Sequence, residues 1–204
     1  MLARPLVLSL ARLAFATTAI VAMTYQFATS AGTSFRQANF FSFVTIQSTI
    51  LGVAALFLLV VVPRARRNPS FDGARSAVVL YMALVGVVFA LLLSGLQEEL
   101  QTTVPWVDFI LHKLMPVVLV VDWLVDPPRH RLPAWTMLAW LAYPAAWLTY
   151  TLVRGEIADW YPYPFVDVSK LGYGGVLTRS VGLTLGFALA GAVLLWLGNR
   201  RARE

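Results

Sequence analysis

The sequence predicts an all-α integral membrane protein, a single domain over residues 1–204 that folds as one bundle of six transmembrane helices. Hydrophobic residues make up 59% of the chain and charged residues 13%, a balance outside the range of water-soluble domains. The apolar residues form blocks of about 20, the length that crosses about 30 Å of hydrocarbon as a helix. Helices are expected because backbone groups in lipid must bond within their own segment, and no alternating strand pattern indicates a barrel.

Six blocks of this length follow one another along the chain. They cover Pro5–Phe27, Phe40–Val62, Arg75–Leu96, Val104–Asp126, Pro133–Val153 and Val176–Gly198. The end of the first block faintly resembles a signal-peptide cleavage site, but Arg12 interrupts its apolar run, so we expect this span to be retained. The second and fourth blocks stop at prolines, at Pro63 and at the pair Pro127-Pro128.

The links on the side opposite these prolines differ in length. The third and fourth spans are joined by a short link that carries Glu98 and Glu99 but no basic residue, so these helices should be antiparallel neighbours. The link from Arg154 to Gly175 is long, and its aromatic residues suit a membrane interface. In the sixth span, small residues such as Gly182, Gly186 and Gly191 allow close helix packing, either within the bundle or in a dimer.

The net charge of +6 comes from basic residues that gather in alternate links. One set is Arg4, Arg64, Arg66, Arg67, Arg75, Arg129, Arg131, Arg200, Arg201 and Arg203, whereas the opposite links carry only Arg36, Arg154 and Lys170. By the positive-inside rule, this placement predicts that both termini face the cytoplasm. It indicates contact with anionic lipid headgroups and argues against nucleic-acid binding.

Several kinds of site are excluded by composition. The chain has no cysteine, so disulfides, thiolate metal sites and cysteine nucleophiles cannot occur. Its two histidines, His112 and His130, are too few for a zinc cluster, and His130 lies in a cytoplasmic link where it cannot pair with His112 on a haem. We therefore expect no metal and no cofactor.

His112, within the fourth span, is the strongest candidate for chemistry because ionisable groups in a membrane are costly. Its imidazole can be neutral and accept a proton, and Asp108, four residues earlier on the same helical face, can hold one ring nitrogen. Ser42, Thr45 and Thr49 share one face of the second span and offer hydroxyl groups at a similar depth. The structural alternative is a packed histidine with hydroxyls bonded to their own helix.

The other charged residues within the spans are better explained by pairing. They are Arg12, Lys113, Asp122, Asp126 and Arg179. A pair such as Arg12 with Asp122 would neutralise two costly charges in the cytoplasmic half.

Three short stretches resemble the androgen-induced-gene family of six-helix membrane proteins and its bacterial relatives. Phe41-Ser42-Phe43 is similar to the segment with the catalytic threonine, with serine in its place. His112, with Pro116 and with Asp122 ten residues on, is similar to the catalytic histidine stretch, although the proline falls one position earlier. Tyr163-Pro164-Phe165-Val166-Asp167 is similar to the external Tyr-Pro-Phe-x-Glu motif.

The resemblance implies a hydrolase of fatty-acid esters within a bacterial cytoplasmic (inner) membrane, with membrane lipids as its partners. Ser42 would be the nucleophile and His112 the base, and Asn39, Thr45 or Gln47 would supply a hydrogen bond to the oxyanion. The alternative class is a non-enzymatic membrane protein, either a small-solute carrier or an assembly factor. Paired broken half-helices, which are typical of carriers, are not evident in the sequence.

Overall fold

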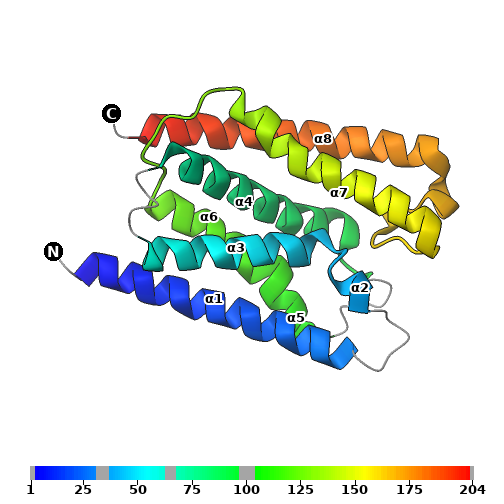
Figure 1. Cartoon of the computed structure of the whole chain (residues 1–204), viewed down its shortest axis with the longest axis horizontal. Coiled ribbons are helices and arrows are strands. Elements are labelled where there is room, and N and C mark those ends of the chain that lie inside the picture. The colour runs from blue at the N-terminus through cyan, green and yellow to red at the C-terminus, as the bar shows by residue number, and fades with distance from the viewer. Residues whose placement is uncertain (1–2, 31–36, 63–67, 97–103, 203–204) are drawn as a thin grey trace.

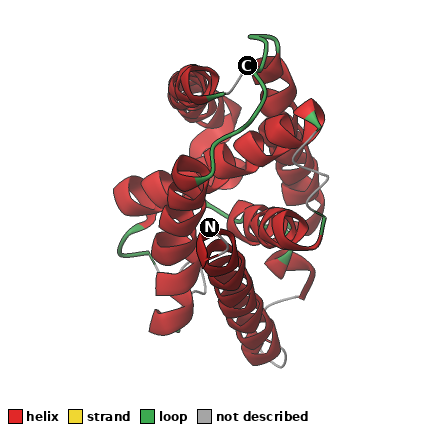
Figure 2. Cartoon of the chain, turned by 90° about the vertical axis from the view of Figure 1, so that its left-hand side faces the viewer, coloured by secondary structure: helices red, strands yellow, loops and turns green. Residues whose placement is uncertain are grey.

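The computed structural model describes residues 3–30, 37–62, 68–96 and 104–202. Within these ranges the chain is helical with short connections, and no strand occurs among them (Figure 2). The α-helices are α1 (Ala3–Ser30), α2 (Gln37–Phe40), α3 (Val44–Val61), α4 (Pro69–Val88), α5 (Pro105–Phe109), α6 (Met115–Val125), α7 (Thr136–Ala158) and α8 (Val168–Arg201). Two π-helical turns, η2 (Phe89–Leu93) and η3 (Ile110–Leu114), and one 3-10 turn, η4 (Pro164–Val166), complete the described elements. The predicted all-α class is confirmed.

Four helices in the described part of the chain are long and apolar enough to cross a membrane. They are Pro5–Thr29 in α1, Val44–Val61 in α3, Pro69–Leu93 in α4 with η2, and Val168–Arg201 in α8. The protein is therefore an integral membrane protein by the length and composition of its helices. The predicted fourth span corresponds to the helical course 105–125, which passes through α5, η3 and α6. The predicted fifth span corresponds to α7.

The helix boundaries differ from the predicted spans where capping or a turn decides them. Helix α3 begins at Val44 rather than Phe40, because the chain turns at Ser42, whose amide donates to the Asn39 carbonyl at 2.9 Å. Helix α4 begins at Pro69, earlier than predicted, because the Asn68 side chain accepts from the Ser70 amide at 2.9 Å and proline suits the first helical position.

The helices form two groups that share α4 (Figure 1). Helices α1, α3, α4 and α6 surround the larger apolar core, which contains Leu56, Met82 and Trp123. Helices α7 and α8 pack on α4 through a second cluster that includes Tyr81 and Phe187. We call the end of the bundle where α1 begins and α8 ends the terminal end, and the opposite end the α2 end (Figure 1).

Much of the charge that predicted the orientation lies outside the described residues. This holds for Arg36, for the arginines at 64, 66 and 67, for the acidic link 97–103 and for Arg203. Helix α1 begins and helix α8 ends at the same end of the bundle (Figure 1). Which side of the membrane that end faces stays a prediction.

The small residues of the sixth span divide between the bundle and its surface. A Cβ atom added at Gly191 would lie 3.2 Å from Leu80 and 3.4 Å from Met137, so this glycine lets α8 approach its neighbours. Nothing lies within 4 Å of a Cβ added at Gly182 or Gly186. Among these three glycines, packing inside the bundle is thus confirmed for Gly191.

Candidate active site

His112 lies in η3, the π-helical turn between α5 and α6. Its Nδ1 atom is 2.9 Å from a carboxylate oxygen of Asp108, and both side chains are buried. The predicted contact between these two residues is confirmed. A carboxylate accepts hydrogen bonds, so the proton in this contact belongs to Nδ1, and in the neutral imidazole the lone pair is then on Nε2. In that form, Nε2 is the ring atom that can accept a proton.

The face of the imidazole is held by Phe89, the first residue of η2. The two rings stack with centroids 4.2 Å apart and planes 10° apart. Gly86 lets α4 come close enough for this contact, because a Cβ atom there would lie 3.0 Å from Pro116. Two π-helical turns, a feature often found at functional sites, thus meet at one histidine. No pattern in the sequence indicated Phe89, because the contact depends on where both turns form.

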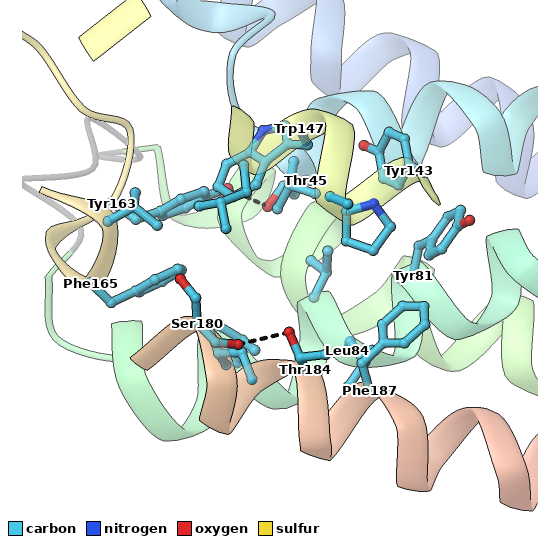
Figure 3. A pocket seen from close by; sticks show the side chains of 18 of the residues that line it. Thr45, Tyr81, Leu84, Tyr143, Trp147, Tyr163, Phe165, Ser180, Thr184 and Phe187 are labelled. Atoms are coloured by element: carbon cyan, nitrogen blue, oxygen red, sulfur yellow. Dashed lines mark hydrogen bonds between the residues drawn. The ribbon is translucent and has the colours of Figure 1, made fainter. Parts of the chain in front are cut away.

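Beside His112 lies a cavity of about 390 Å³ between α3, α4, α7 and α8 (Figure 3). This volume lies within the usual range of ligand pockets, about 300 to 1,000 Å³. Most of the lining is apolar. Its hydroxyl groups belong to Thr45, Tyr81, Tyr143, Tyr163, Ser180 and Thr184. The cavity therefore suits a ligand that is largely hydrocarbon and has a small polar centre.

Of the three hydroxyls predicted on one face of the second span, Thr45 is the one that lines the cavity with His112. It lies in the first turn of α3, is 5% exposed, and its oxygen is 3.4 Å from the Tyr163 hydroxyl (Figure 3). Burial raises the pKa of Tyr163 to about 12, so its phenol stays neutral and can donate a hydrogen bond. The two oxygens form a polar centre in an apolar wall.

Ser42 lies outside the cavity lining. Its hydroxyl is within 3.1 Å of the Ala38 carbonyl and 3.0 Å of the Tyr150 hydroxyl, and the side chain is 1% exposed. The turn before α3 separates it from the face that presents Thr45, so the predicted stripe of hydroxyls begins at Thr45. The structure does not bring Ser42 and His112 to one cavity, and its role as nucleophile stays a prediction.

The two amides predicted as oxyanion donors also lie outside the cavity lining and have other partners. The Asn39 side-chain oxygen accepts a hydrogen bond from Arg154. The Gln47 amide nitrogen donates to the Phe41 carbonyl at 2.8 Å, and its oxygen accepts from the Tyr143 hydroxyl at 2.9 Å. Gln47 therefore orients a residue of the lining without belonging to it.

The residues of the predicted external motif divide between the cavity and α8. Tyr163 and Phe165 border the cavity, with their rings stacked 5.1 Å apart, and Pro164 begins η4. Asp167 caps α8, because its side chain accepts from the amides of Ser169 at 3.0 Å and Lys170 at 3.3 Å. The motif thus covers the α2 end of the cavity and starts the next helix.

The buried charges near the terminal end form a separate network. Arg12 donates to Asp122 at 2.7 Å and to Asp126 at 2.6 Å, and Arg75 donates to the other Asp122 oxygen at 2.8 Å. The predicted pair of Arg12 with Asp122 is confirmed. The network ties α1 and α4 to α6, so we assign these charges to packing rather than chemistry.

Within the described ranges, no group of three or more His, Cys, Asp or Glu side chains is placed to hold a metal ion. No protein-family model, curated protein or solved structure matches this chain.

Proposed function

We propose that this protein is an intramembrane hydrolase of fatty-acid esters, with Thr45 as its nucleophile and His112 as its general base. The observation that supports this most directly is that Thr45 and His112 line the same apolar cavity. Asp108 holds the other ring nitrogen of His112, which gives the order of nucleophile, base and orienting group found in hydrolases of several folds. The apolar walls suit the acyl part of a lipid.

The proposed reaction is acyl transfer in two steps. Nε2 of His112 takes the Thr45 hydroxyl proton as the oxygen bonds to the ester carbonyl carbon. The carbonyl oxygen becomes an oxyanion, to which Tyr163 donates a hydrogen bond. Imidazolium returns the proton to the departing alkoxide, leaving an acyl-threonine. Water then attacks with His112 again as base, and the free fatty acid leaves as Thr45 regains its proton.

Thr45 is preferred to Ser42 because of what each hydroxyl faces. Ser42 contacts the Tyr150 hydroxyl and the Ala38 carbonyl, and it is absent from the cavity lining. Thr45 borders the cavity and has Tyr163 beside it as a neutral donor. A nucleophile must reach both its base and the substrate carbonyl, and Thr45 meets the second condition better.

We also propose how the chain crosses the membrane. The course 105–125 and α7 would complete six membrane spans with the four apolar helices, which places the catalytic groups within the bilayer. Both termini would face the cytoplasm, and the protein would lie in a bacterial cytoplasmic membrane. The shared position of the two helix ends in Figure 1 supports an even number of spans.

The test is covalent labelling with a phosphonate probe that reacts with activated hydroxyl nucleophiles. We expect the purified wild-type protein to be labelled, and Thr45→Ala and His112→Ala to lose the label. Thr45→Ser should keep it because a hydroxyl remains. Thr49→Ala is the matched control, since Thr49 is a buried threonine one helical turn further along α3 and outside the lining.

The outcomes separate the candidates. Label lost in Ser42→Ala and kept in Thr45→Ala would restore Ser42 as the nucleophile. Label equal in all folded variants, with no ester cleaved in liposomes, would overturn the enzyme and favour the carrier or assembly factor.

A further inference from the structure

The cavity beside His112 has its exposed lining on the side of the bundle. Among the residues that line it, two are exposed, Ala145 on α7 and Thr184 on α8. The remaining lining residues are buried or half-buried. Both exposed positions lie near the middle of their helices. The exposed part of the lining, which we call the opening, therefore lies far from either end of the bundle.

Both helices depart from regular packing at this level. Pro144 lies inside α7 and has no N–H for the Trp140 carbonyl, which instead accepts from the Tyr81 hydroxyl at 2.9 Å. Thr184 donates its hydroxyl to the Ser180 carbonyl at 2.8 Å, a contact that tends to bend helices (Figure 3). Both features are of a kind that bends helices, and they lie at the level of the two exposed positions.

The two ends of the cavity are covered by aromatic side chains. At the α2 end, Tyr163 is 3% and Val166 1% exposed, and Phe165 stacks on Tyr163. Towards the terminal end, the Tyr81 ring lies 4.7 Å from Tyr143 and 6.0 Å from Phe187. A ligand that came from the aqueous phase would have to pass one of these layers, whereas the side is open.

The surface around the opening is apolar. On α8, Leu177, Leu185 and Leu189 are 65%, 67% and 69% exposed, and on α7 Leu138 is 71% exposed. In an integral membrane protein, such side chains contact lipid tails. The opening between Ala145 and Thr184 thus faces the hydrocarbon rather than water.

We infer that the gap between α7 and α8 is a lateral portal through which one acyl chain of a membrane-dissolved lipid enters the cavity. The inference deepens the proposed function, since it rests on a lipid as substrate and adds its route and form. A cavity of about 390 Å³ lies at the small end of ligand pockets, so it takes a single chain with its ester rather than a whole two-chain phospholipid.

The absence of cysteine makes a direct test possible, because the portal can be bridged without competing thiols. The double variant Ala145→Cys with Thr184→Cys is joined by a reducible bis-maleimide linker and placed in lipid nanodiscs. A photoactivatable long-chain fatty acid is added for a short time and irradiated, and labelled peptides are identified by mass spectrometry. We expect bridging to cut the labelling of Leu141–Leu148 by about tenfold, and reduction of the linker to restore it.

Two controls accompany the bridge. Leu138→Cys with Val193→Cys places the same linker on lipid-facing positions of α7 and α8 outside the lining, and should leave labelling unchanged. Ala145→Trp fills the portal without a linker and should reduce labelling in the same way. Unchanged labelling in both the bridged and the Trp variants overturns the portal, as does label confined to outward residues such as Leu185.

The test is independent of catalysis because the probe has no ester. If labelling depends on the portal and no ester is cleaved, the portal stands and the hydrolase proposal fails. If esters are cleaved at the wild-type rate in the bridged protein, the hydrolase stands and the portal fails.

Discussion

At the residue scale, the hydrogen-bonding capacity of the polar groups in the candidate site is only partly used by their contacts with one another. Asp108 occupies Nδ1 of His112, which leaves Nε2 for a proton. The Thr45 and Tyr163 oxygens are 3.4 Å apart, longer than a strong O–H···O bond of about 2.7 Å. Both hydroxyls can therefore form better hydrogen bonds with an ester than with each other.

Removing either Thr45 or His112 should abolish hydrolysis. Because a nucleophile and its base act as a unit, Thr45→Ala and His112→Ala should each cost about 10³-fold or more in kcat, and the double variant should be little worse. Asp108→Asn should cost less, about 10- to 100-fold, because it only orients the imidazole. Ester turnover in liposomes measures all four, with matched monodispersity. Additive losses would show that the two residues do not act together.

Replacing Tyr163 tests the oxyanion donor. Tyr163→Phe should lower kcat by about 10²- to 10³-fold with little change in KM, because the hydrogen bond forms chiefly in the transition state. Tyr161→Phe, in the same loop but outside the lining, is the control. Since the pKa of Tyr163 is raised to about 12, phenol ionisation should not reduce the wild-type rate between about pH 8 and about pH 10. A donor role is excluded if kcat is unaffected.

At the element scale, two sets of contacts fix the positions of the helices around His112. The Arg12, Arg75, Asp122 and Asp126 network joins α1, α4 and α6 near the terminal end. The close approach at Gly86 joins α4 to α6 beside the site. The charge network contributes to stability, whereas the close approach at Gly86 sets the position of the imidazole. Variants of the network should therefore change the free energy of unfolding, and variants of Gly86 should also change turnover.

Breaking the charge network should destabilise the fold without changing the kcat of the folded protein. Asp122→Ala removes the carboxylate that Arg12 and Arg75 share in a buried site, which should cost about 3 to 5 kcal/mol. The midpoint of thermal unfolding in detergent measures this, with exposed Glu156→Ala as the control. The kcat of the protein that remains folded should match the wild type. A selective loss of kcat at normal stability would instead give Asp122 a catalytic role.

Enlarging Gly86 should push α4 away from α6. A Cβ atom would meet the rigid Pro116 ring at 3.0 Å, so Gly86→Ala should destabilise by about 1 to 3 kcal/mol and lower turnover by shifting His112. Gly186→Ala has open space around the new atom and should be neutral or gain about 0.5 to 1 kcal/mol from helix propensity. Unfolding midpoints compare the two, and equal effects would contradict the packing described.

At the scale of the whole molecule, the orientation of the bundle decides which side of the membrane the α2 end faces. The distribution of arginine predicts a cytoplasmic terminal end. A reporter that is active only in the cytoplasm, fused after Glu204, should be active. A fusion inserted in the link 97–103 is the matched control and should be silent. The reverse pattern in well-expressed fusions would invert the topology.

The sequence by itself determined the membrane environment, the helical class and the local contacts. Apolar blocks of sufficient length require helices in lipid, whatever their neighbours. The contact of His112 with Asp108 depends only on helical spacing, so it could be predicted, and so could the opposite charges of Arg12 and Asp122. Helix starts at capping residues were missed by several positions, as at Asn68.

Only the tertiary structure decided which of the predicted hydroxyls lines a cavity with the histidine. Ser42 and Thr45 are three residues apart and would share a face of one continuous helix, but the turn before Val44 sends Ser42 towards Tyr150 and leaves Thr45 in the cavity. The rest of the site is formed by segments that lie far apart in the chain. They supply the stack of Phe89 on His112, the cover by Tyr163 and the proposed portal at Ala145. Such contacts depend on how the helices pack, which no periodicity within one segment records.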